Sequence, residues 1–273
     1  MLSHILFFLP SIYSYKIKTF NLNKHTPDLH LFACAESKGH NISMPREFTF
    51  CFRHMKTYNN KSGLWSSTFF GSRLMDDGNE TGIGFDYWSY VPWLWFGQPG
   101  KLSTWVSSGG ESDFNMLTWL HTCFTMNSVD GSSTMYENGR LVSENKFKEL
   151  KEFGEAVPEF VVTDINVGCK HFKNWKPSHT GIVTDFQLFG RILTNKELEK
   201  WTGCEERLEG DLVSWDSVEW SLHRNGNGSE VEYREFEKDV CDMRNMSYHF
   251  FPSRRSFKKS LELCDKIYGK LNV

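Results

Sequence analysis

The chain has 273 residues, and its 31 lysines and arginines stand against 34 aspartates and glutamates, a net charge of −3. This balance excludes the strongly basic surface that is typical of nucleic-acid-binding proteins. Charged residues make up 24% and hydrophobic residues 39% of the chain, which excludes an intrinsically disordered protein. We therefore expect a folded globular protein with no nucleic-acid partner.

The N-terminus favours a secretory signal peptide over residues 1–14. A short apolar run at 5–9 is followed by the small residue Ser14 near the expected cleavage point. The alternative is a buried N-terminal strand. The run is far shorter than the roughly 20 residues that a membrane-spanning helix needs, and no later run approaches that length. We therefore expect no transmembrane helix in this chain.

Cysteines and glycosylation sequons indicate the compartment. The seven cysteines form no CxxC pairs, so a structural zinc site is not expected, and their wide spacing is typical of disulfides in an oxidising compartment. Asn-x-Ser/Thr sequons, which are potential glycosylation sites, occur at Asn41, Asn60, Asn79, Asn227 and Asn245. We expect an extracellular protein, either secreted or the ectodomain of a membrane protein. Because the cysteine count is odd, at least one thiol is free or pairs outside this chain.

Short strand candidates follow one another from residue 45 onward. In chain order they are residues 47–58, 64–70, 83–96, 117–126, 161–168, 181–189 and 212–215. Pro92 interrupts 83–96, which predicts an edge strand or a pair of strands. Asn138-Gly139 supplies the positive φ of a type I′ turn, so we expect a hairpin over 135–142. In 181–189 strict alternation predicts one shared face for Ile182, Thr184, Phe186 and Leu188.

One short helix is predicted inside this β region. Thr194 and Glu197 have the spacing of a capping box, in which each side chain bonds the backbone N–H of the other residue. Leu198 and Trp201 supply an apolar side, and we expect Gly203 in the left-handed conformation that ends many helices. Many short strands with a single short helix indicate an all-β protein built as a two-sheet antiparallel sandwich.

Charge composition divides the chain after this helix. Residues 205–239 hold 11 acidic and 4 basic residues, whereas 241–273 hold 3 acidic and 7 basic residues and an apolar stripe with helical spacing over 256–268. The expected organisation is therefore an N-terminal lead-in over 15–44, the sandwich over 45–222, an acidic linker over 223–240 and a small C-terminal α/β segment over 241–273.

The run from His121 to Ser128, HTCFTMNS, resembles the pentraxin signature His-x-Cys-x-Ser/Thr-Trp-x-Ser. His121, Cys123, Thr125 and Ser128 match it, and Met126 stands where the family has tryptophan. Residues 48–51 and 210–215 look like the family's early and closing strands, so the resemblance to the pentraxin and laminin-G-like (concanavalin A-like lectin) group covers about 45–222. It implies a two-sheet antiparallel jelly-roll with one short helix.

The resemblance also implies a disulfide between Cys51 and Cys123. A second inferred pair is Cys169–Cys204, and the alternative for these two residues is a pair of buried free thiols. The partners of the remaining three cysteines stay unassigned: Cys34, Cys241 and Cys264.

Pentraxins bind ligands through two calcium ions, and this sequence departs from that pattern. Lys170, His171 and Phe172 stand where the family has oxygen ligands, although calcium takes six to eight oxygens. The family's earlier Asp-Asn pair is matched only weakly, by Asp77 and Asn79, and Asn79 is also a sequon. We therefore expect no metal or other cofactor, with calcium not favoured.

The C-terminal segment resembles the start of a C-type lectin-like domain. Phe250-Phe251-Pro252 and the run 256–264, ending in Cys264, look like that domain's first strand and first helix. In that family the helix cysteine pairs near the far end of the domain, so Cys264 pairs either beyond this chain or with Cys241. No sugar-binding loop of that family is carried over, because those loops would follow Val273.

Aromatic side chains crowd residues 87–96, and Trp88, Trp93 and Trp95 are the candidate ligand-binding residues. They form either a platform on which sugar rings stack or part of the sandwich core. The chain has no HExxH, GxSxG or P-loop motif, and no predicted strand carries the paired carboxylates of a glucan hydrolase. We expect no enzymatic activity.

The sequence therefore favours a lectin-like recognition module whose ligand is a glycan or an extracellular protein. The alternative is a structural or adhesion module within the ectodomain of a larger receptor or channel. The oligomeric state is left open.

Overall fold

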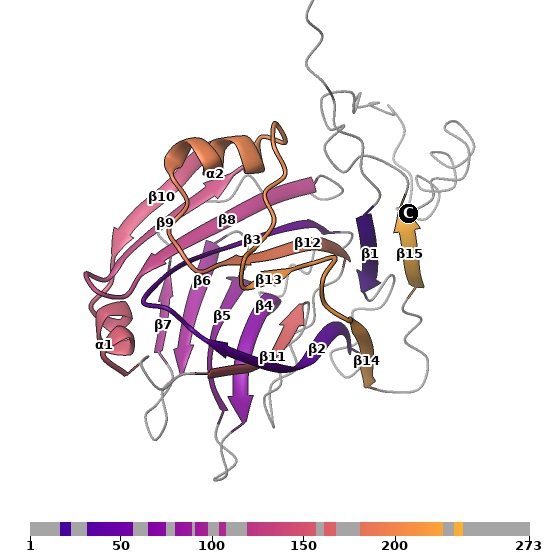
Figure 1. Ribbon diagram of the computed structural model, residues 1–273, viewed down its shortest axis with the longest axis horizontal. Helices are drawn as coiled ribbons and strands as arrows, with labels where there is room; N and C mark the ends of the chain where they lie inside the picture. The colour runs from indigo at the N-terminus through magenta and orange to yellow at the C-terminus, as the bar shows by residue number, and fades with distance from the viewer. Residues whose placement is uncertain are drawn as a thin grey trace, which may run out of the picture.

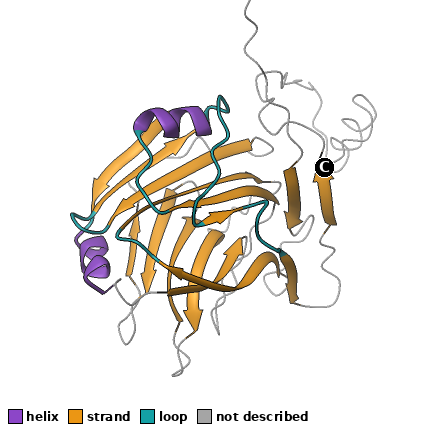
Figure 2. Cartoon of the chain, viewed as in Figure 1, coloured by secondary structure: helices purple, strands orange, loops and turns teal. Residues whose placement is uncertain are grey.

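The computed structural model describes residues 17–22, 32–56, 65–74, 80–88, 91–97, 104–107, 119–156, 161–167, 181–225 and 232–236. Within them, two antiparallel sheets pack face to face as a jelly-roll sandwich (Figure 1). Strands dominate the described part of the chain, and two helices lie at its margin (Figure 2). The all-β sandwich predicted from the sequence is confirmed.

The first sheet, sheet A, has eight strands. Its order is β10 (Arg140–Lys146), β9 (Ser132–Glu137), β8 (Trp119–Asn127), β3 (Glu47–Lys56), β12 (Gly181–Phe189), β1 (Ile17–Leu22) and β15 (Glu232–Phe236), and β13 (Val213–Ser214) pairs with β12 off this path.

The second sheet, sheet B, has seven strands. Its order is β14 (Ser221–Asn225), β2 (Phe32–Ser43), β11 (Val161–Val167), β4 (Trp65–Leu74), β5 (Glu80–Trp88), β6 (Val91–Gly97) and β7 (Thr104–Ser107).

Most strands lie where the sequence predicts them. The segment around Pro92 forms the strand pair β5 and β6, and Pro92 precedes Trp93, the first residue of β6 that pairs with β7. Its missing N–H therefore interrupts no bond to β7. At the β9–β10 hairpin, φ is 48° at Asn138 and 82° at Gly139, which is the positive-φ pair that the type I′ prediction requires.

Three strands lie in segments that the sequence assigned to a lead-in and a linker. β1 pairs with β12 and β15, and β2 pairs with β11 and β14, so the expected lead-in over 15–44 supplies a strand to each sheet. β15 lies in the expected acidic linker over 223–240. The sandwich therefore extends on both sides of the range 45–222. The sequence did not predict these strands because they are specified by distant partners rather than by their own periodicity.

Phenylalanines dominate the core between the sheets. Phe50 of β3, Phe124 of β8 and Phe85 of β5 are fully buried, and their ring centroids lie 4.5 to 6.3 Å apart. Sheet B adds Leu94 of β6 and Ile165 of β11, both with no exposed surface. Side chains of both sheets thus meet in one apolar layer, as sandwich packing requires.

A β-bulge changes the predicted alternation of β12. The register with β3 shifts between Thr184 and Gln187, and Asp185 has φ of 53°. Val183, Phe186 and Leu188 consequently belong to the core, whereas the prediction that Thr184 shares a face with Phe186 is wrong.

Helix α2 (Asn195–Thr202) covers part of the outer face of sheet A (Figure 1). The predicted capping box is present, since Thr194 accepts from the Glu197 N–H and Glu197 Oε2 accepts from the Thr194 N–H at 2.8 Å. Leu198 and Trp201 are buried in a second apolar cluster beneath the helix, together with Tyr136 of β9.

Helix α1 (Lys148–Ala156) was not predicted from the sequence; its Lys148 and Glu152 form an i,i+4 ion pair at 2.9 Å. Neither described helix is long and apolar enough to span a membrane.

The end of α2 differs from its prediction. Gly203 has right-handed φ of −80°, and the left-handed residue is Cys204, with φ of 61°. Gly203 is required for another reason, because a Cβ there would lie 2.7 Å from the Glu199 carbonyl oxygen and 3.7 Å from the Gly139 Cα. The Gly139 N–H also donates to Thr202 Oγ1 at 2.9 Å, so the β9–β10 turn docks against the end of α2.

Candidate functional site

Strand register places the three candidate tryptophans on one face of sheet B. Trp88 lies in β5 and Trp93 and Trp95 lie in β6, where Phe85 pairs with Leu94. Phe85 and Leu94 are fully buried and mark the core side of these strands. Because side chains alternate along a strand, the three tryptophan positions are on the opposite, outer side. The register therefore favours the aromatic platform over the core interpretation.

Two further tryptophan positions share this face. Trp65 of β4 is directly opposite Trp88, and Trp105 of β7 is directly opposite Trp95. Sequence reasoning missed both, because neither belongs to the aromatic-dense segment and only the pairing of β4 and β7 brings them in. We call the outer face of β4–β7, with its five tryptophan positions at 65, 88, 93, 95 and 105, the tryptophan face.

A polar strip adjoins the tryptophan face on β11 and β2. Asn166 pairs in register with Phe70 on one side and with Glu36 on the other, and its neighbours Ile165 and Val167 are in the core. The Asn166 side chain is buried, and neither amide atom has a hydrogen-bond partner among the residues that the structure describes. Glu36 is also buried and forms an ion pair with Lys38, in which Glu36 Oε2 lies 3.0 Å from Lys38 Nζ. Amide and carboxylate groups therefore flank the aromatic positions.

A buried ionic network lies on the outer face of sheet A. Arg53 Nε donates to Asp185 Oδ2 at 2.8 Å, and the guanidinium carbon of Arg53 lies 4.2 Å from the ring centroid of Trp201. Gln187 Nε2 also donates to Asp185 at 2.8 Å, and Arg207 forms a longer ion pair with Asp185 at 3.3 Å. Burial opposes ionisation of Asp185, but the charges of Arg53 and Arg207 outweigh it and hold the pKa of this carboxyl below its ordinary value. The network ties α2 to β3 and β12.

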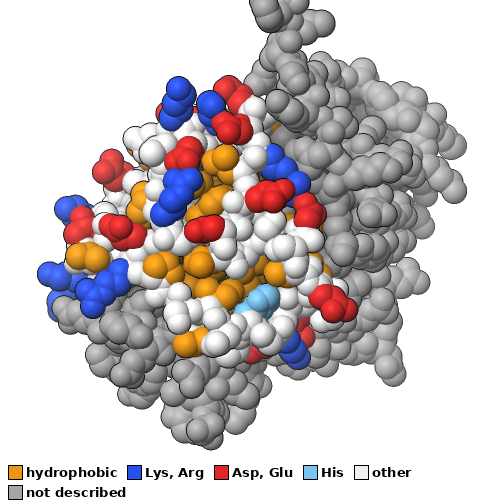
Figure 3. All heavy atoms as spheres, viewed as in Figure 1, with side chains coloured by type: hydrophobic (Ala, Val, Ile, Leu, Met, Phe, Trp, Pro, Cys, Tyr) orange, Lys and Arg blue, Asp and Glu red, His pale blue; other side chains and the backbone are white. Residues whose placement is uncertain are grey.

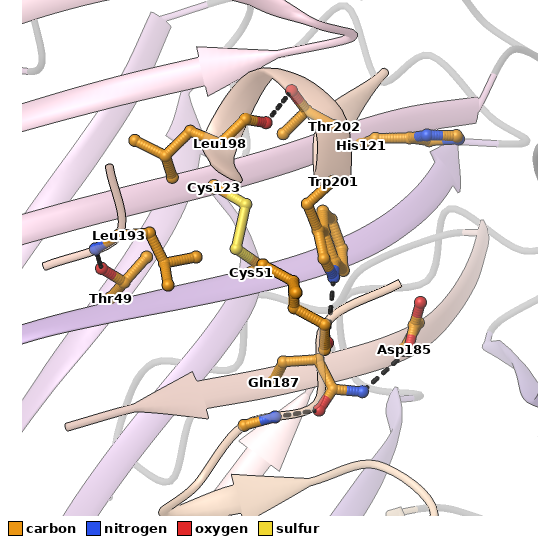
Figure 4. Close-up of a disulfide and its surroundings, with 12 residues drawn as sticks. Thr49, Cys51, His121, Cys123, Asp185, Gln187, Leu193, Leu198, Trp201 and Thr202 are labelled. Carbon is orange, nitrogen blue, oxygen red and sulfur yellow. Dashed lines mark hydrogen bonds between the residues drawn. A yellow bond between two sulfur atoms is a disulfide. The ribbon is translucent and has the colours of Figure 1, made fainter. Parts of the chain in front are cut away.

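The residues of the pentraxin-like signature are structural. Cys123 forms a disulfide with Cys51, as the resemblance implied, and both cysteines are fully buried beneath α2 (Figure 4). Cys123 is therefore no nucleophile. His121 Nδ1 lies 2.8 Å from Arg53 Nη1 and belongs to the ionic network.

Cys204 is disulfide-bonded, and its partner lies outside the described residues. The free-thiol alternative is therefore wrong for Cys204, and the pairing with Cys169 stays a prediction. The Cys204 sulfur lies 2.7 Å from Arg53 Nη1 and 2.8 Å from His121 Nδ1.

Several candidate residues lie outside the described part of the chain. They are Asp77, Asn79, Lys170, His171, Phe172 and the sequons at Asn60, Asn227 and Asn245. The same holds for the signal-peptide segment 1–14 and the C-type lectin-like segment 241–273. Asn41, the remaining sequon, is exposed on β2. Among the described residues, no group of three or more His, Cys, Asp or Glu side chains could hold a metal ion.

Acidic and basic side chains are interspersed on the described face seen in Figure 3. That face therefore carries no extended area of one sign.

Comparisons with known proteins agree with this architecture. No protein-family model matches the chain. By sequence it is similar to the Pentraxin-related protein PTX3 of Homo sapiens, with 27% identity over 119 residues, and of Mus musculus, with 29% identity over 111 residues. These matches cover 41% and 38% of this chain but 30% and 28% of the relatives, so the chain spans less than a third of their length.

Solved structures show the same fold. A SAP-like pentraxin from Limulus polyphemus superimposes with a TM-score of 0.55 at 15% identity, covering 83% of this chain and 97% of that one. The extracellular region of zebrafish Gpr126/Adgrg6 superimposes with a TM-score of 0.53 at 16% identity, covering 77% of this chain and 27% of that one. The chain therefore has a pentraxin-like, lectin-like jelly-roll fold.

Proposed function

We propose that this chain is an extracellular recognition module that binds a glycan on the tryptophan face of sheet B. The observation that carries the proposal is the register of β4–β7, which gathers five tryptophan positions on one outer face. Tryptophan offers a large, rigid apolar surface with a polar N–H, which suits the mixed character of a sugar ring. Tryptophans distributed without a common role would be expected on both faces of these strands rather than on the outer face alone.

The spacing of the positions fits an extended ligand. Residues two apart in a strand lie about 7 Å from each other, and directly opposed residues on paired strands have Cβ atoms about 5 Å apart. Trp93 and Trp95 therefore extend the face along β6, and Trp105 widens it across to β7.

The proposal includes recognition without calcium and without catalysis. Lys170, His171 and Phe172 stand where pentraxins have oxygen ligands, which supports a calcium-independent mode. Two of the buried carboxylates in the described part serve other contacts, since Glu36 pairs with Lys38 and Asp185 with Arg53. Neither is arranged as the acid or base of a hydrolase.

The test is binding of the full chain, secreted from a eukaryotic host, to an array of glycans and to a panel of extracellular proteins, each in calcium and in a chelator. We expect glycan binding that the chelator does not change. Binding that the chelator abolishes contradicts the calcium-independent mode. Binding to proteins alone, or to nothing, contradicts the glycan proposal and favours the structural or adhesion role.

A further inference from the structure

The tryptophan face of sheet B has an acidic position in its middle. Asp86 of β5 is directly opposite Trp93 of β6 on one side and Ser67 of β4 on the other. Trp88 lies two residues further along β5, on the same side of the strand. The neighbouring Phe85 is fully buried in the core, so Asp86 is an outer position. One aspartate position is thus bordered by tryptophan positions both along its own strand and across the sheet.

The strands of this face bring acidic but not basic residues to it. The outer positions of β5 include two acids, Glu80 and Asp86. Arg73 of β4 is the one basic residue in the described parts of β4–β7, and it pairs with Thr81 on the inner side, two residues from the buried Ile83. Within β4–β7 as described, the tryptophan face therefore has positions for negative charge and none for positive charge.

The neighbouring polar strip on β11 and β2 carries two carboxylates and one cation. Lys38 is the one lysine or arginine in these two strands, and its Nζ lies 3.0 Å from Glu36 Oε2. Asp164 of β11 is directly opposite Lys38 on one side and Ser72 of β4 on the other, so a second carboxylate position borders the same cation. The charge of Lys38 is therefore already compensated by its own strip.

We propose that the glycan bound on the tryptophan face is uncharged, and that Asp86 selects it against glycans that carry sialic acid or sulfate. The inference rests on the proposed function and adds the class of ligand to it. A carboxylate has two oxygens that accept hydrogen bonds, which suits the neighbouring hydroxyl groups of a neutral sugar ring. The apolar face of the same ring stacks on an indole. Asp86 and a tryptophan position next to it can therefore serve one ring together.

An anionic sugar meets opposition at the same place. Opposed positions on paired strands are about 5 Å apart and positions two along a strand about 7 Å, so a ring at Trp93 or Trp88 lies close to Asp86. These separations are below the Debye length of about 8 Å at physiological salt, so the repulsion between two negative charges is only partly screened. The faces of aromatic rings are negative as well. An anion would lose hydration there and gain no described cation in return.

Matched glycans test the selection. The full chain is presented with neutral oligosaccharides, each beside its own sialylated and sulfated form, and the affinities are compared within each set. We expect the anionic forms to bind about tenfold more weakly than the neutral form. Equal or tighter binding of the anionic forms overturns this inference and leaves glycan recognition by the tryptophan face standing. If no glycan binds in any form, both fall.

Two substitutions on β5 separate Asp86 from the general charge of the chain. Asp86→Asn keeps the size of the side chain and removes its charge, so we expect the preference for neutral over sialylated glycan to shrink at least threefold. Glu80→Gln is the matched control, because it removes one negative charge from the same face of the same strand about 20 Å away, well beyond the Debye length. An unchanged preference in a folded Asp86→Asn variant, or an equal change in both variants, overturns the role of Asp86.

Salt dependence gives a test that needs no variant. Because the selection is a repulsion between charges, the wild-type preference for neutral over sialylated glycan should shrink as sodium chloride rises from about 0.05 to 0.5 M. Affinity for the neutral glycan itself should change little, since no net charge is paired in that complex. A preference that stays constant across this range contradicts charge-based selection by the face.

Discussion

The Arg53–Asp185 pair shows how much one buried contact depends on distant chain segments. The two side chains are 1% and 0% exposed, and 132 residues separate them in the sequence. Two desolvated charges are tolerated because each completes the other's hydrogen bonds, so removal of one partner leaves an uncompensated charge in the interior. The tryptophan ring of Trp201 and the backbone of α2 are anchored on the same guanidinium.

We predict that Asp185→Ala lowers the free energy of unfolding by about 3–5 kcal/mol, because Arg53 stays buried without its carboxylate. Arg53→Met combined with Asp185→Leu should cost clearly less than the sum of the single changes. Urea denaturation followed by tryptophan fluorescence measures both. A loss below about 1 kcal/mol for Asp185→Ala would show that the pair is dispensable.

The sequence did not predict this network, for a physical reason. Strand alternation could place Arg53 on the same side of β3 as Cys51, but its partner depends on the bulge at Asp185. A bulge reverses the alternation of every residue that follows it, and no local signal in 181–189 shows one. His121 and Cys204 join the network only through the pairing of β3 with β8 and the end of α2.

Elements were predicted where their determinants are local. The capping box of α2 depends on residues three apart, and the β9–β10 turn depends on Asn138-Gly139, so both were predicted correctly. β1, β2 and β15 were not predicted, because they are specified by partners far along the chain. The sequence named three of the five tryptophan positions as candidates, and it missed Trp65 and Trp105 because these join the others only through strand pairing.

The start of α2 should be sensitive to acid. Hydrogen bonds from Arg191, and then from Thr194, lower the pKa of Glu197 from its ordinary value of 4.5 to about 2. Burial of the carboxylate opposes this shift but does not outweigh it. A carboxyl with a depressed folded-state pKa contributes stability above pH 4.5, and this is lost as the pH falls towards 2.

We predict that Glu197→Gln weakens this loss of stability between pH 4.5 and 2, and that Thr194→Ala lowers the free energy of unfolding by about 1 kcal/mol at neutral pH. Thermal unfolding across this pH range measures both effects. An unchanged pH profile in Glu197→Gln would contradict the role assigned to this carboxylate.

Close approach, rather than a left-handed conformation, explains the glycine at the end of α2. A methyl group at Gly203 would lie 2.7 Å from the Glu199 carbonyl oxygen, and neither backbone can move without displacing the docked β9–β10 turn. We predict that Gly203→Ala costs about 1–3 kcal/mol of unfolding free energy through overpacking. Gly190→Ala is the matched control, because its new methyl group would have no neighbour nearer than 3.4 Å and should change stability little. Equal effects of the two substitutions would contradict this packing argument.

At the scale of the whole molecule, the two outer faces of the sandwich differ. Sheet A is partly covered by α2 and carries the disulfide and the ionic network, so the signature residues His121 and Cys123 serve stability. Sheet B carries the tryptophan positions on strands β4–β7. The sequence could predict the sandwich and its central disulfide from the family resemblance, because both depend on a motif within β3 and β8. It could not decide between platform and core for the tryptophans, since that depends on the register of four strands.

The most direct test of the proposed function is the affinity of the chain for the glycan that it binds best on the array. We predict that Trp93→Ala combined with Trp95→Ala weakens binding at least tenfold while the thermal unfolding temperature stays close to that of the wild type. Val129→Ala combined with Leu141→Ala removes two other large apolar groups, 51% and 48% exposed, and should leave the affinity unchanged. A folded tryptophan variant that binds as tightly as the wild type would contradict recognition through the tryptophan face.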